Sequence, residues 1–383
     1  MKLLIVAGGG GHFSPALAVI EQLPKEWDVM VVGRKYAFEG DKTLSLEYQT
    51  AKKLGITFTS LTTGRLQRRF TRHTLQSLVK IPVGFTQAIQ ILQNYQPDVV
   101  LSFGGYVSVP VVLASALLRI PIVVHEQILG AGLANNIAAK FAQKICISWE
   151  QSRQFFSQDK VVLTGNPIRV IASKAKQSQD NGIAKLLSVV RNDEKKIIYI
   201  TGGSGGAHAI NVLIEECLEK LLQKYTLVHQ TGDAKEFGDF DRLAKQKEAL
   251  PIDLQKRYML TKFVDPAEVF SVLEKADLVI ARSGINTVTE LLAFGKPCLL
   301  IPLPYGQHNE QLTNALFVKQ LGLGEVAQQQ TLTGEKLAVL LDTMMHNLEK
   351  YTKQSSHAKK LLQVDAAQKI ISVIADVQKE KKR

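Results

Sequence analysis

ARSGINTVTELLAFGKPCLLIPLPYGQHNEQLTNA, residues 281–315, follows a short apolar run and combines a helical run with a second strand-like run. The apolar run at 278–281 predicts a buried parallel strand, and Ser283 and Gly284 precede the helix. Unpaired amides at the start of a helix bind anions, and the carboxylate of Glu290 lies where it would hold vicinal hydroxyls. The stretch therefore predicts a phosphate bound beside a ribose, and an ordinary βαβ unit without a ligand is the alternative.

Polar side chains follow the second strand of this unit. They suit the hydroxyls of a sugar, although a solvated helix start would have the same composition. These residues are Gln307, His308, Asn309, Gln311 and Asn314.

Strand-like and helix-like runs alternate along the chain, which predicts an α/β protein with parallel, doubly wound sheets. The strand-like runs are 3–7, 29–33, 99–102, 122–125, 144–147, 161–163, 196–201, 226–230, 258–263, 278–281 and 298–301. A strand, a glycine-rich turn and a helix follow one another twice, with AGGGGH at 7–12 and GGSGGAH at 202–208. We therefore expect two Rossmann-like domains facing each other across a cleft, with ligands beyond the carboxyl ends of the strands. In the first helix we expect Ser14 as the N-cap and Pro15 at the first position.

The polar segment SKAKQSQDNG at 173–182 interrupts the apolar rhythm, so the domain boundary is expected there or slightly before it. We assign the N-terminal domain to 1–165 and the C-terminal domain to 166–349. Residues 350–383 form a predicted helix that would pack back on the N-terminal domain, and they end in the charged tail KEKKR.

The composition is that of a globular protein with a basic surface. The chain has 383 residues, 45% of them hydrophobic, and a formal net charge of +12. Such a charge favours a polyanionic partner, which is a nucleic acid, an anionic lipid or a phosphorylated substrate. No run is long enough to span a bilayer, and the first apolar run is expected to be a strand and not an export signal.

Metal-binding signals are weak. The three cysteines lie far apart in apolar contexts and are expected to be buried thiols: Cys146, Cys217 and Cys298. Asp239 and Asp241 resemble the aspartate pair that holds a divalent cation in some nucleotide-sugar enzymes. Because they follow no apolar strand, we expect them in a solvated loop.

The glycine-rich turns do not match the fingerprints of other nucleotide-binding proteins. The pattern G-x-G-x-x-G fails because its last position falls on Phe13 or Ser14 in the first turn and on His208 in the second. The sequence contains no G-x-x-x-x-G-K-[ST] motif. Glycines at these turns would still let a substrate approach the backbone closely.

His12 directly follows four glycines and is a candidate general base, because histidine titrates near neutral pH. A helix-capping or packing role is the alternative. His208 occupies the corresponding place in the second half, where a phosphate contact or a cap is expected. His125 ends a predicted strand and is either structural or, with Glu126 and Gln127, part of the cleft.

Residues 64–92, GRLQRRFTRHTLQSLVKIPVGFTQAIQIL, combine positive charge with apolar side chains. This pattern favours contact with an anionic membrane surface. Nucleic-acid phosphates or a solvated loop ahead of a core helix are the alternatives. The candidate membrane residues are Arg68, Arg69, Phe70 and Arg72.

Taken together, these motifs resemble one family, the bacterial glycosyltransferases that add N-acetylglucosamine to an undecaprenyl-linked muramyl peptide. The resemblance covers nearly the whole chain and includes GGGGHFSPALAV at 8–19, LSFGGYVSVPVVLASALLRIPIVVHEQ at 101–127, GLANN at 132–136 and VVLTGNPIR at 161–169. It continues with TGGSGGAHAIN at 201–211, KFVD at 262–265 and RSGINTVTELLAFGKPCLLIPLP at 282–304.

The resemblance implies a GT-B fold and an inverting transfer from UDP-N-acetylglucosamine to the C4 hydroxyl of the lipid-linked N-acetylmuramyl peptide. His12 and Glu290 would be the catalytic residues. Contacts to the UDP-sugar would fall on Gly9, Gly10, Gly11, Arg169, Ser204, Val264, Ile285, Asn286, Thr287, Val288, Thr289, Glu290 and Gln311. Contacts to the acceptor would fall on Gly104, Gly105, Tyr106, Glu126 and Asn135.

The same resemblance implies a peripheral protein at the cytoplasmic face of the membrane, with no tightly bound cofactor or metal and no nucleic-acid partner. Three positions depart from the family, which has threonine at Gly9, asparagine at Ile128 and histidine or glutamine at Glu310. Asn135 or Gln127 would replace the hydrogen bond lost at Ile128, so we expect activity with altered sugar contacts. A UDP-sugar epimerase or another glycosyl transfer on the same fold, and a membrane-docked nucleotide-sugar binding subunit, are the alternatives.

Overall fold

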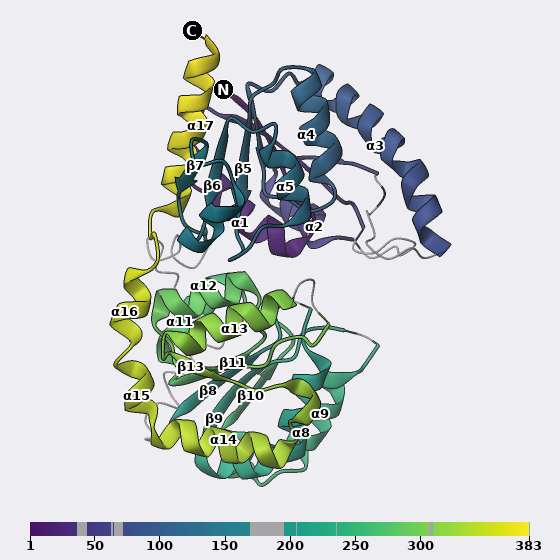
Figure 1. The fold of residues 1–383 in the computed structure, drawn as a ribbon. Coiled ribbons are helices and arrows are strands. Elements are labelled where there is room, and N and C mark those ends of the chain that lie inside the picture. Colours follow the sequence, from purple (N-terminus) through teal and green to yellow (C-terminus); the bar gives the residue numbers. More distant parts are fainter. Residues whose placement is uncertain are drawn as a thin grey trace. The chain divides into compact units, whose positions relative to one another are not determined.

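A computed structural model describes residues 1–36, 44–62, 64, 72–168, 195–203, 205–234, 236–305 and 309–382. The chain forms two compact units (Figure 1). Unit 1 comprises Met1–Arg169 and Gln363–Arg383, and unit 2 comprises Val170–Leu362. The segment in which the boundary is expected, 173–182, lies outside the described residues.

Unit 1 is built on a parallel sheet of seven described strands in the order β3-β2-β1-β4-β5-β6-β7. The strands are β1 Lys2–Val6, β2 Asp28–Gly33, β3 Thr57–Ser60, β4 Val99–Ser102, β5 Ile122–Glu126, β6 Lys144–Ile147 and β7 Val161–Leu163. The helices are α1 Gly10–Ile20, α2 Leu46–Leu54, α3 Arg72–Tyr95, α4 Ser108–Leu117, α5 Leu133–Ala139, the 3-10 helix η1 Glu150–Phe155 and α17 Ala366–Lys382. The chain reverses its direction of strand addition at β1, because Leu3 pairs with Val29 on one side and with Val99 on the other.

Unit 2 repeats this plan with six described strands in the order β10-β9-β8-β11-β12-β13. They are β8 Ile197–Thr201, β9 Thr226–Gln230, β10 Tyr258–Thr261, β11 Leu278–Ala281, β12 Cys298–Leu300 and β13 Gly324–Val326. The helices are α8 His208–Lys224, α9 Asp239–Glu248, α10 Ile252–Gln255, α11 Pro266–Lys275, α12 Ile285–Phe294, α13 Glu310–Gln320, the 3-10 helix η5 Gln329–Thr331, α14 Gly334–His346, α15 Leu348–Thr352 and α16 Ser355–Lys360.

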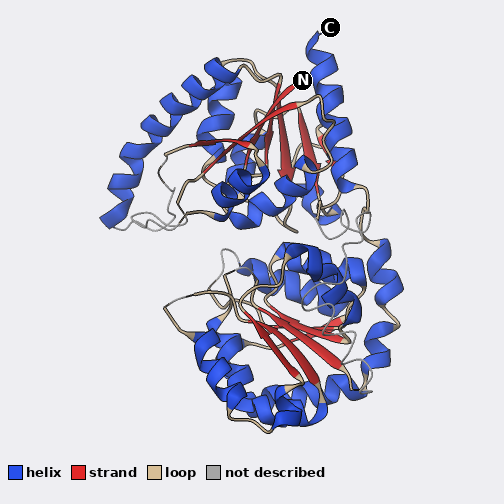
Figure 2. Ribbon diagram, turned by 180° about the vertical axis from the view of Figure 1, so that it is seen from behind, coloured by secondary structure: helices blue, strands red, loops and turns tan. Residues whose placement is uncertain are grey.

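The predicted fold class is confirmed in both units. Each sheet is parallel and has helices on both faces (Figure 2), so central strands such as β4, β5, β8 and β9 are buried along their whole length. All the predicted strands are present, whereas β3 and β13 were not predicted. Both are short edge strands with partly exposed residues, and they lack the continuous apolar run that marks a central strand.

Helix α17 belongs to unit 1 and completes its core. Ala367, Ile370 and Ile374 are buried in one cluster with Leu3 and Ile5 of β1. Helices α15 and α16 belong to unit 2, so the chain returns to unit 1 only after residue 362. None of the helices in the described ranges is long and apolar enough to cross a bilayer.

Candidate functional site

Two glycine-rich loops meet at the carboxyl end of the sheet of unit 1, where β1 and β4 diverge. The N–H of Gly8 donates a hydrogen bond to the carbonyl oxygen of Gly104, at 3.2 Å. Gly105 has φ +80°, and a Cβ atom there would lie 2.8 Å from the Cα and carbonyl oxygen of Gly8. The loops can therefore approach this closely only because glycine occupies these positions.

Helix α1 begins earlier than its sequence predicts. Gly9 is its N-cap with φ +93°, and its carbonyl oxygen accepts the N–H groups of His12 and Phe13. The prediction of Ser14 as the cap is wrong, because the positive φ available to Gly9 lets the chain enter the helix directly after the strand. Gly10 and Gly11, which are predicted to contact the UDP-sugar, consequently form the first turn of α1.

His12 is held by a hydrogen bond on one side of its ring. Its Nδ1 lies 2.9 Å from the carbonyl oxygen of Phe103 and 3.3 Å from the side-chain amide of Gln127. A carbonyl oxygen only accepts, so Nδ1 carries the hydrogen and Nε2 keeps its lone pair. Burial lowers the pKa of His12, the hydrogen bond to Phe103 offsets part of this effect, and the charge of Arg34 lowers the pKa further. The imidazole is thus neutral near pH 7 and suited to accept a proton.

Arg34 occupies the space in front of Gly9. A Cβ atom at Gly9 would lie 2.9 Å from a terminal nitrogen of this guanidinium. The same side chain lies 3.5 Å from the carboxylate of the buried Glu47 and 5.7 Å from the ring centroid of Tyr106. The threonine that the family resemblance predicts at position 9 does not fit this backbone, because the positive φ of Gly9 disfavours a β-branched side chain.

Glu126 and Asn135, both predicted to contact the acceptor substrate, hold the loop that follows β5. The carboxylate of Glu126 accepts the N–H groups of Ile128 and Gly132 at 3.1 and 2.8 Å, and the amide of Asn135 at 3.1 Å. Burial raises the pKa of Glu126, and these hydrogen bonds offset part of the increase. Asn135 also donates to the carbonyl oxygen of His125, so its N–H groups are already used within the protein.

His125 is completely buried and serves the structure of unit 1. Its Nε2 lies 3.2 Å from the carbonyl oxygen of Gly165 and 3.2 Å from the hydroxyl of Ser148. Burial lowers its pKa to about 4, so the ring is neutral at physiological pH. Of the two roles that the sequence leaves open, the structure favours the structural one.

The start of α12 in unit 2 is held by two residues of α13. The hydroxyl of Ser283 donates to the carbonyl oxygen of Gln311 at 2.7 Å, and the amide of Asn314 donates to the carbonyl oxygen of Ser283 at 3.0 Å. Asn314 is buried and positions the helix start through its amide nitrogen; its role toward sugar hydroxyls stays a prediction. Gly284 is the N-cap of α12, and residues 285–287 form its first turn, whose amides have no acceptor within the helix.

Glu290 lies further along α12 and is partly buried. Burial raises its pKa from 4.5 to about 7. Its carboxylate influences Tyr199, whose hydroxyl pKa is raised by burial and, to a smaller extent, by the charge of Glu290. Asn286 and Thr287 are partly exposed, whereas Ile285, Val288 and Thr289 are buried, so the last three can contact a ligand only through the backbone.

The second glycine-rich turn packs directly on the loop after β9. Gly206 has φ +74°, and a Cβ atom there would lie 2.1 Å from the carbonyl oxygen of Thr231. The side chain of Gln230 donates to the carbonyl oxygen of Gly203 at 3.1 Å and accepts the N–H of Val264 at 3.3 Å. Sequence reasoning missed Gln230; its only signal was a polar residue at the end of a buried strand.

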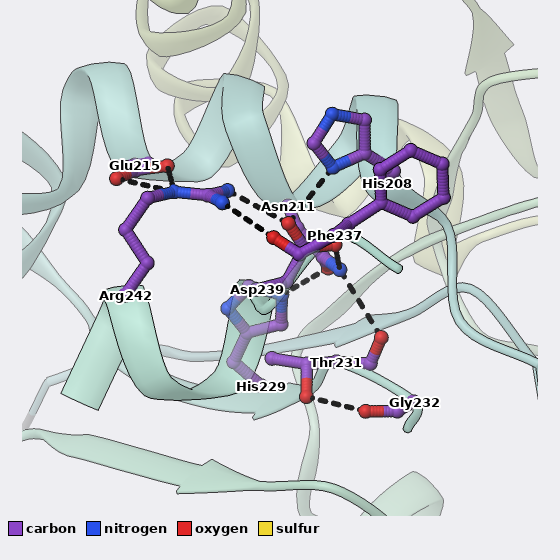
Figure 3. A network of polar contacts seen from close by, with 9 residues as sticks. All are labelled: His208, Asn211, Glu215, His229, Thr231, Gly232, Phe237, Asp239 and Arg242. Atoms are coloured by element: carbon purple, nitrogen blue, oxygen red, sulfur yellow. Dashed lines mark hydrogen bonds and ion pairs between the residues drawn. The ribbon is translucent and has the colours of Figure 1, made fainter. Parts of the chain in front are cut away.

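A polar network supports the start of α8 (Figure 3). Asp239 accepts hydrogen bonds from His208 at 2.8 Å, from Asn211 at 2.7 Å and from Arg242 at 2.7 Å. Burial alone would raise the pKa of Asp239, but these hydrogen bonds outweigh it and hold the pKa below its usual value. The prediction of a solvated loop at Asp239 is wrong, because this buried residue begins α9 and is held by three side chains.

Several predicted residues lie outside the described part of the chain: Arg68, Arg69, Phe70, Arg169, Ser204, Gln307 and His308. Arg72 begins α3, although its side chain is not described. Among the described residues, no group of three or more His, Cys, Asp or Glu side chains is arranged to hold a metal ion.

Comparisons with known proteins show the family to which this chain belongs. The glycosyltransferase family 28 N-terminal domain matches residues 3–147, and the C-terminal domain of that family matches residues 197–371. The UDP-N-acetylglucosamine–N-acetylmuramyl-(pentapeptide) pyrophosphoryl-undecaprenol N-acetylglucosamine transferase of Geobacter sulfurreducens is 33% identical over 390 residues, 99% of this chain and 100% of that protein.

Solved structures agree with this likeness. The crystal structure of MurG from Acinetobacter baumannii superposes with a TM-score of 0.70 at 25% identity and covers 98% of this chain and 100% of its own. A putative UDP-N-acetylglucosamine 2-epimerase from Listeria monocytogenes superposes with a TM-score of 0.68 at 16% identity and covers 98% of this chain and 95% of its own. At that identity the epimerase shares the fold alone.

Proposed function

Because this chain belongs to glycosyltransferase family 28, we propose that it is an inverting hexosyltransferase of peptidoglycan synthesis. It moves N-acetylglucosamine from UDP-N-acetylglucosamine to the C4 hydroxyl of undecaprenyl-diphosphate-linked N-acetylmuramyl peptide. The observation that carries the proposal is the 33% identity to the Geobacter transferase along 99% of the chain. The two Rossmann-like units are of the GT-B type, which suits a nucleotide-sugar donor and a separate acceptor.

Unit 2 binds the donor. Its sheet reverses strand order between β8 and β11, and ligands of doubly wound sheets bind beyond the carboxyl ends of the strands at such a point. The first-turn amides of α12 face the diphosphate, and the carboxylate of Glu290 accepts hydrogen bonds from the ribose hydroxyls. The backbone of Val264 contacts the uracil, and Ser204 completes the phosphate contacts.

Unit 1 supplies the base. Nε2 of His12 takes the proton of the acceptor C4 hydroxyl, and the oxygen attacks the anomeric carbon of the donor. The bond between that carbon and the β-phosphate oxygen breaks, and UDP leaves with the electron pair. Helix-end amides stabilise the charge of UDP, so the transfer proceeds without a tightly bound metal or cofactor.

The acceptor is a lipid, so the protein works at a membrane. We place it at the cytoplasmic face, held peripherally by the basic and apolar residues Arg68, Arg69, Phe70 and Arg72. The net charge of +12 supports attraction to anionic lipid headgroups. No nucleic-acid partner is included in the proposal.

Transfer of labelled sugar from UDP-N-acetylglucosamine to a polyprenyl-linked muramyl peptide tests the proposal. His12→Ala should reduce turnover by roughly 10² to 10⁴-fold, because it removes the base. Glu290→Ala should reduce kcat/KM by roughly 10- to 100-fold, because it removes charge-assisted hydrogen bonds to the ribose. His346→Ala, which removes an exposed histidine at the end of α14, is the matched control and should leave turnover unchanged.

Two outcomes would contradict the proposed transfer. Epimerised sugar formed from UDP-N-acetylglucosamine alone would indicate an epimerase. Saturable binding of UDP without transfer to any lipid acceptor would indicate a nucleotide-sugar binding subunit.

A further inference from the structure

Gln230 links the two segments of unit 2 that the proposed function assigns to opposite ends of UDP. It is the last residue of β9 and is 7% exposed. Its Nε2 donates to the carbonyl oxygen of Gly203 in the glycine-rich turn, at 3.1 Å. Its Oε1 accepts the N–H of Val264 at 3.3 Å and the hydroxyl of Tyr199 at 3.0 Å.

The position of Gln230 in the sheet explains why it can reach both segments. It pairs with Thr201 of β8 on one side and with Thr261 of β10 on the other. The glycine-rich turn follows β8, and the segment with Val264 follows β10, so one side chain lies between two loops that the sequence separates widely. The primary amide of Gln230 offers a donor and an acceptor in one plane without carrying a charge.

We propose that Gln230 is a positioning residue that holds the glycine-rich turn and the Val264 segment in a fixed relation, so that the diphosphate and the uracil of UDP are bound together. This role rests on the proposed function, because it presupposes that unit 2 binds UDP. A preorganised pair of loops loses less conformational entropy when the ligand binds. Without the link, each loop would have to be ordered by the ligand itself.

Gln230 also holds a third residue, Tyr199. Its hydroxyl donates to Gln230, and its side chain is 3% exposed within β8. The charge of Glu290 contributes to the raised pKa of this hydroxyl. The side chain of Gln230 thus links the glycine-rich turn with the Val264 segment and also accepts the hydroxyl of Tyr199.

Variants at position 230 separate the two connections. At a pH at which the introduced carboxyl group is ionised, Gln230→Glu keeps both acceptor contacts but cannot donate to the carbonyl oxygen of Gly203. Gln230→Met keeps the length of the side chain and removes all three hydrogen bonds. Tyr258→Phe is the matched control, because it deletes a buried hydrogen bond of 2.9 Å to His229, the neighbour of Gln230 in β9, and reaches neither loop.

Calorimetric titration with uridine and with UDP reads the two ends of the ligand separately. For Gln230→Glu we expect the affinity for UDP to fall by roughly tenfold, which is the size expected for one lost hydrogen bond. The affinity for uridine should stay within about twofold of the wild type. For Gln230→Met we expect both affinities to fall, which shows that the loss for UDP does not require the new negative charge. Tyr258→Phe should lower thermal stability and leave both affinities within about twofold of the wild type.

The ratio of UDP affinity to uridine affinity is the decisive quantity, because a general loss of stability would not change it selectively. Wild-type affinity for UDP in Gln230→Glu, or equal losses in all three variants, would overturn the role of Gln230 alone. A wild-type protein that binds neither uridine nor UDP would overturn the proposed function and this assignment together.

Discussion

Glu290 should make unit 2 less stable as the pH rises, and Glu290→Gln should remove this dependence. Burial raises the pKa of this carboxyl from 4.5 to about 7 in the folded protein. A group whose folded pKa is raised contributes stability that is fully present below pH 4.5 and is lost as the pH rises through about 7. The cause is the cost of holding a carboxylate in a poorly solvated place before a ligand has bound.

The size of the effect follows from the same values. At about 1.4 kcal/mol per pH unit, the difference between 4.5 and about 7 corresponds to about 3 kcal/mol. Glu290 is partly exposed, and solvent reduces this figure, so we expect about 1 to 3 kcal/mol. The neutral amide introduced by Glu290→Gln carries no such cost at any pH.

Amide hydrogen exchange of β8 and β11 measures this difference, with β4 and β5 of unit 1 as the internal control. Glu290→Gln should protect the unit 2 strands about as well as the wild type at about pH 5 and up to roughly a hundredfold better at about pH 8.5. Saturating uridine should narrow the gap at the higher pH, because ribose hydroxyls solvate the wild-type carboxylate. A difference in protection that is the same at both pH values would refute the argument.

Further predictions concern unit 1 and the buried thiols. Because burial lowers the pKa of His12, the fall of kcat/KM at acid pH should have its midpoint below pH 6.5, and Arg34→Gln should move that midpoint upward. An unchanged midpoint would show that the charge of Arg34 does not lower the pKa of His12. Gly105→Ala should destabilise unit 1 by about 1 to 3 kcal/mol in thermal unfolding, and Gly130→Ala, whose Cβ would meet its nearest atom at 3.9 Å, should be nearly neutral. Equal effects of the two substitutions would contradict the close approach of Gly105 to Gly8. Burial raises the pKa of each cysteine to about 12, so a thiol reagent at about pH 8 should label none of them until the protein unfolds; rapid labelling of the native protein would contradict this.

The sequence by itself determined the parts of the protein that depend on neighbours along the chain. Apolar runs of strand length predicted the central strands, and glycines after β1 and β8 predicted the tight turns that follow these strands. The position of Glu290 within α12 followed from the distance to Ser283 and Gly284. These features are local, because side-chain periodicity and unpaired helix amides need no knowledge of the rest of the fold.

The tertiary structure alone decided which distant residues meet. Gln230 acts on Gly203 and Val264 because β9 lies between β8 and β10, an order that no local pattern records. The sequence predicted a solvated Asp239, whereas in the folded protein α8 and α9 place His208 and Arg242 within hydrogen-bonding distance of it. Partners on separate strands and helices are selected by the packing of the complete sheet, and so they become visible only once the fold is known.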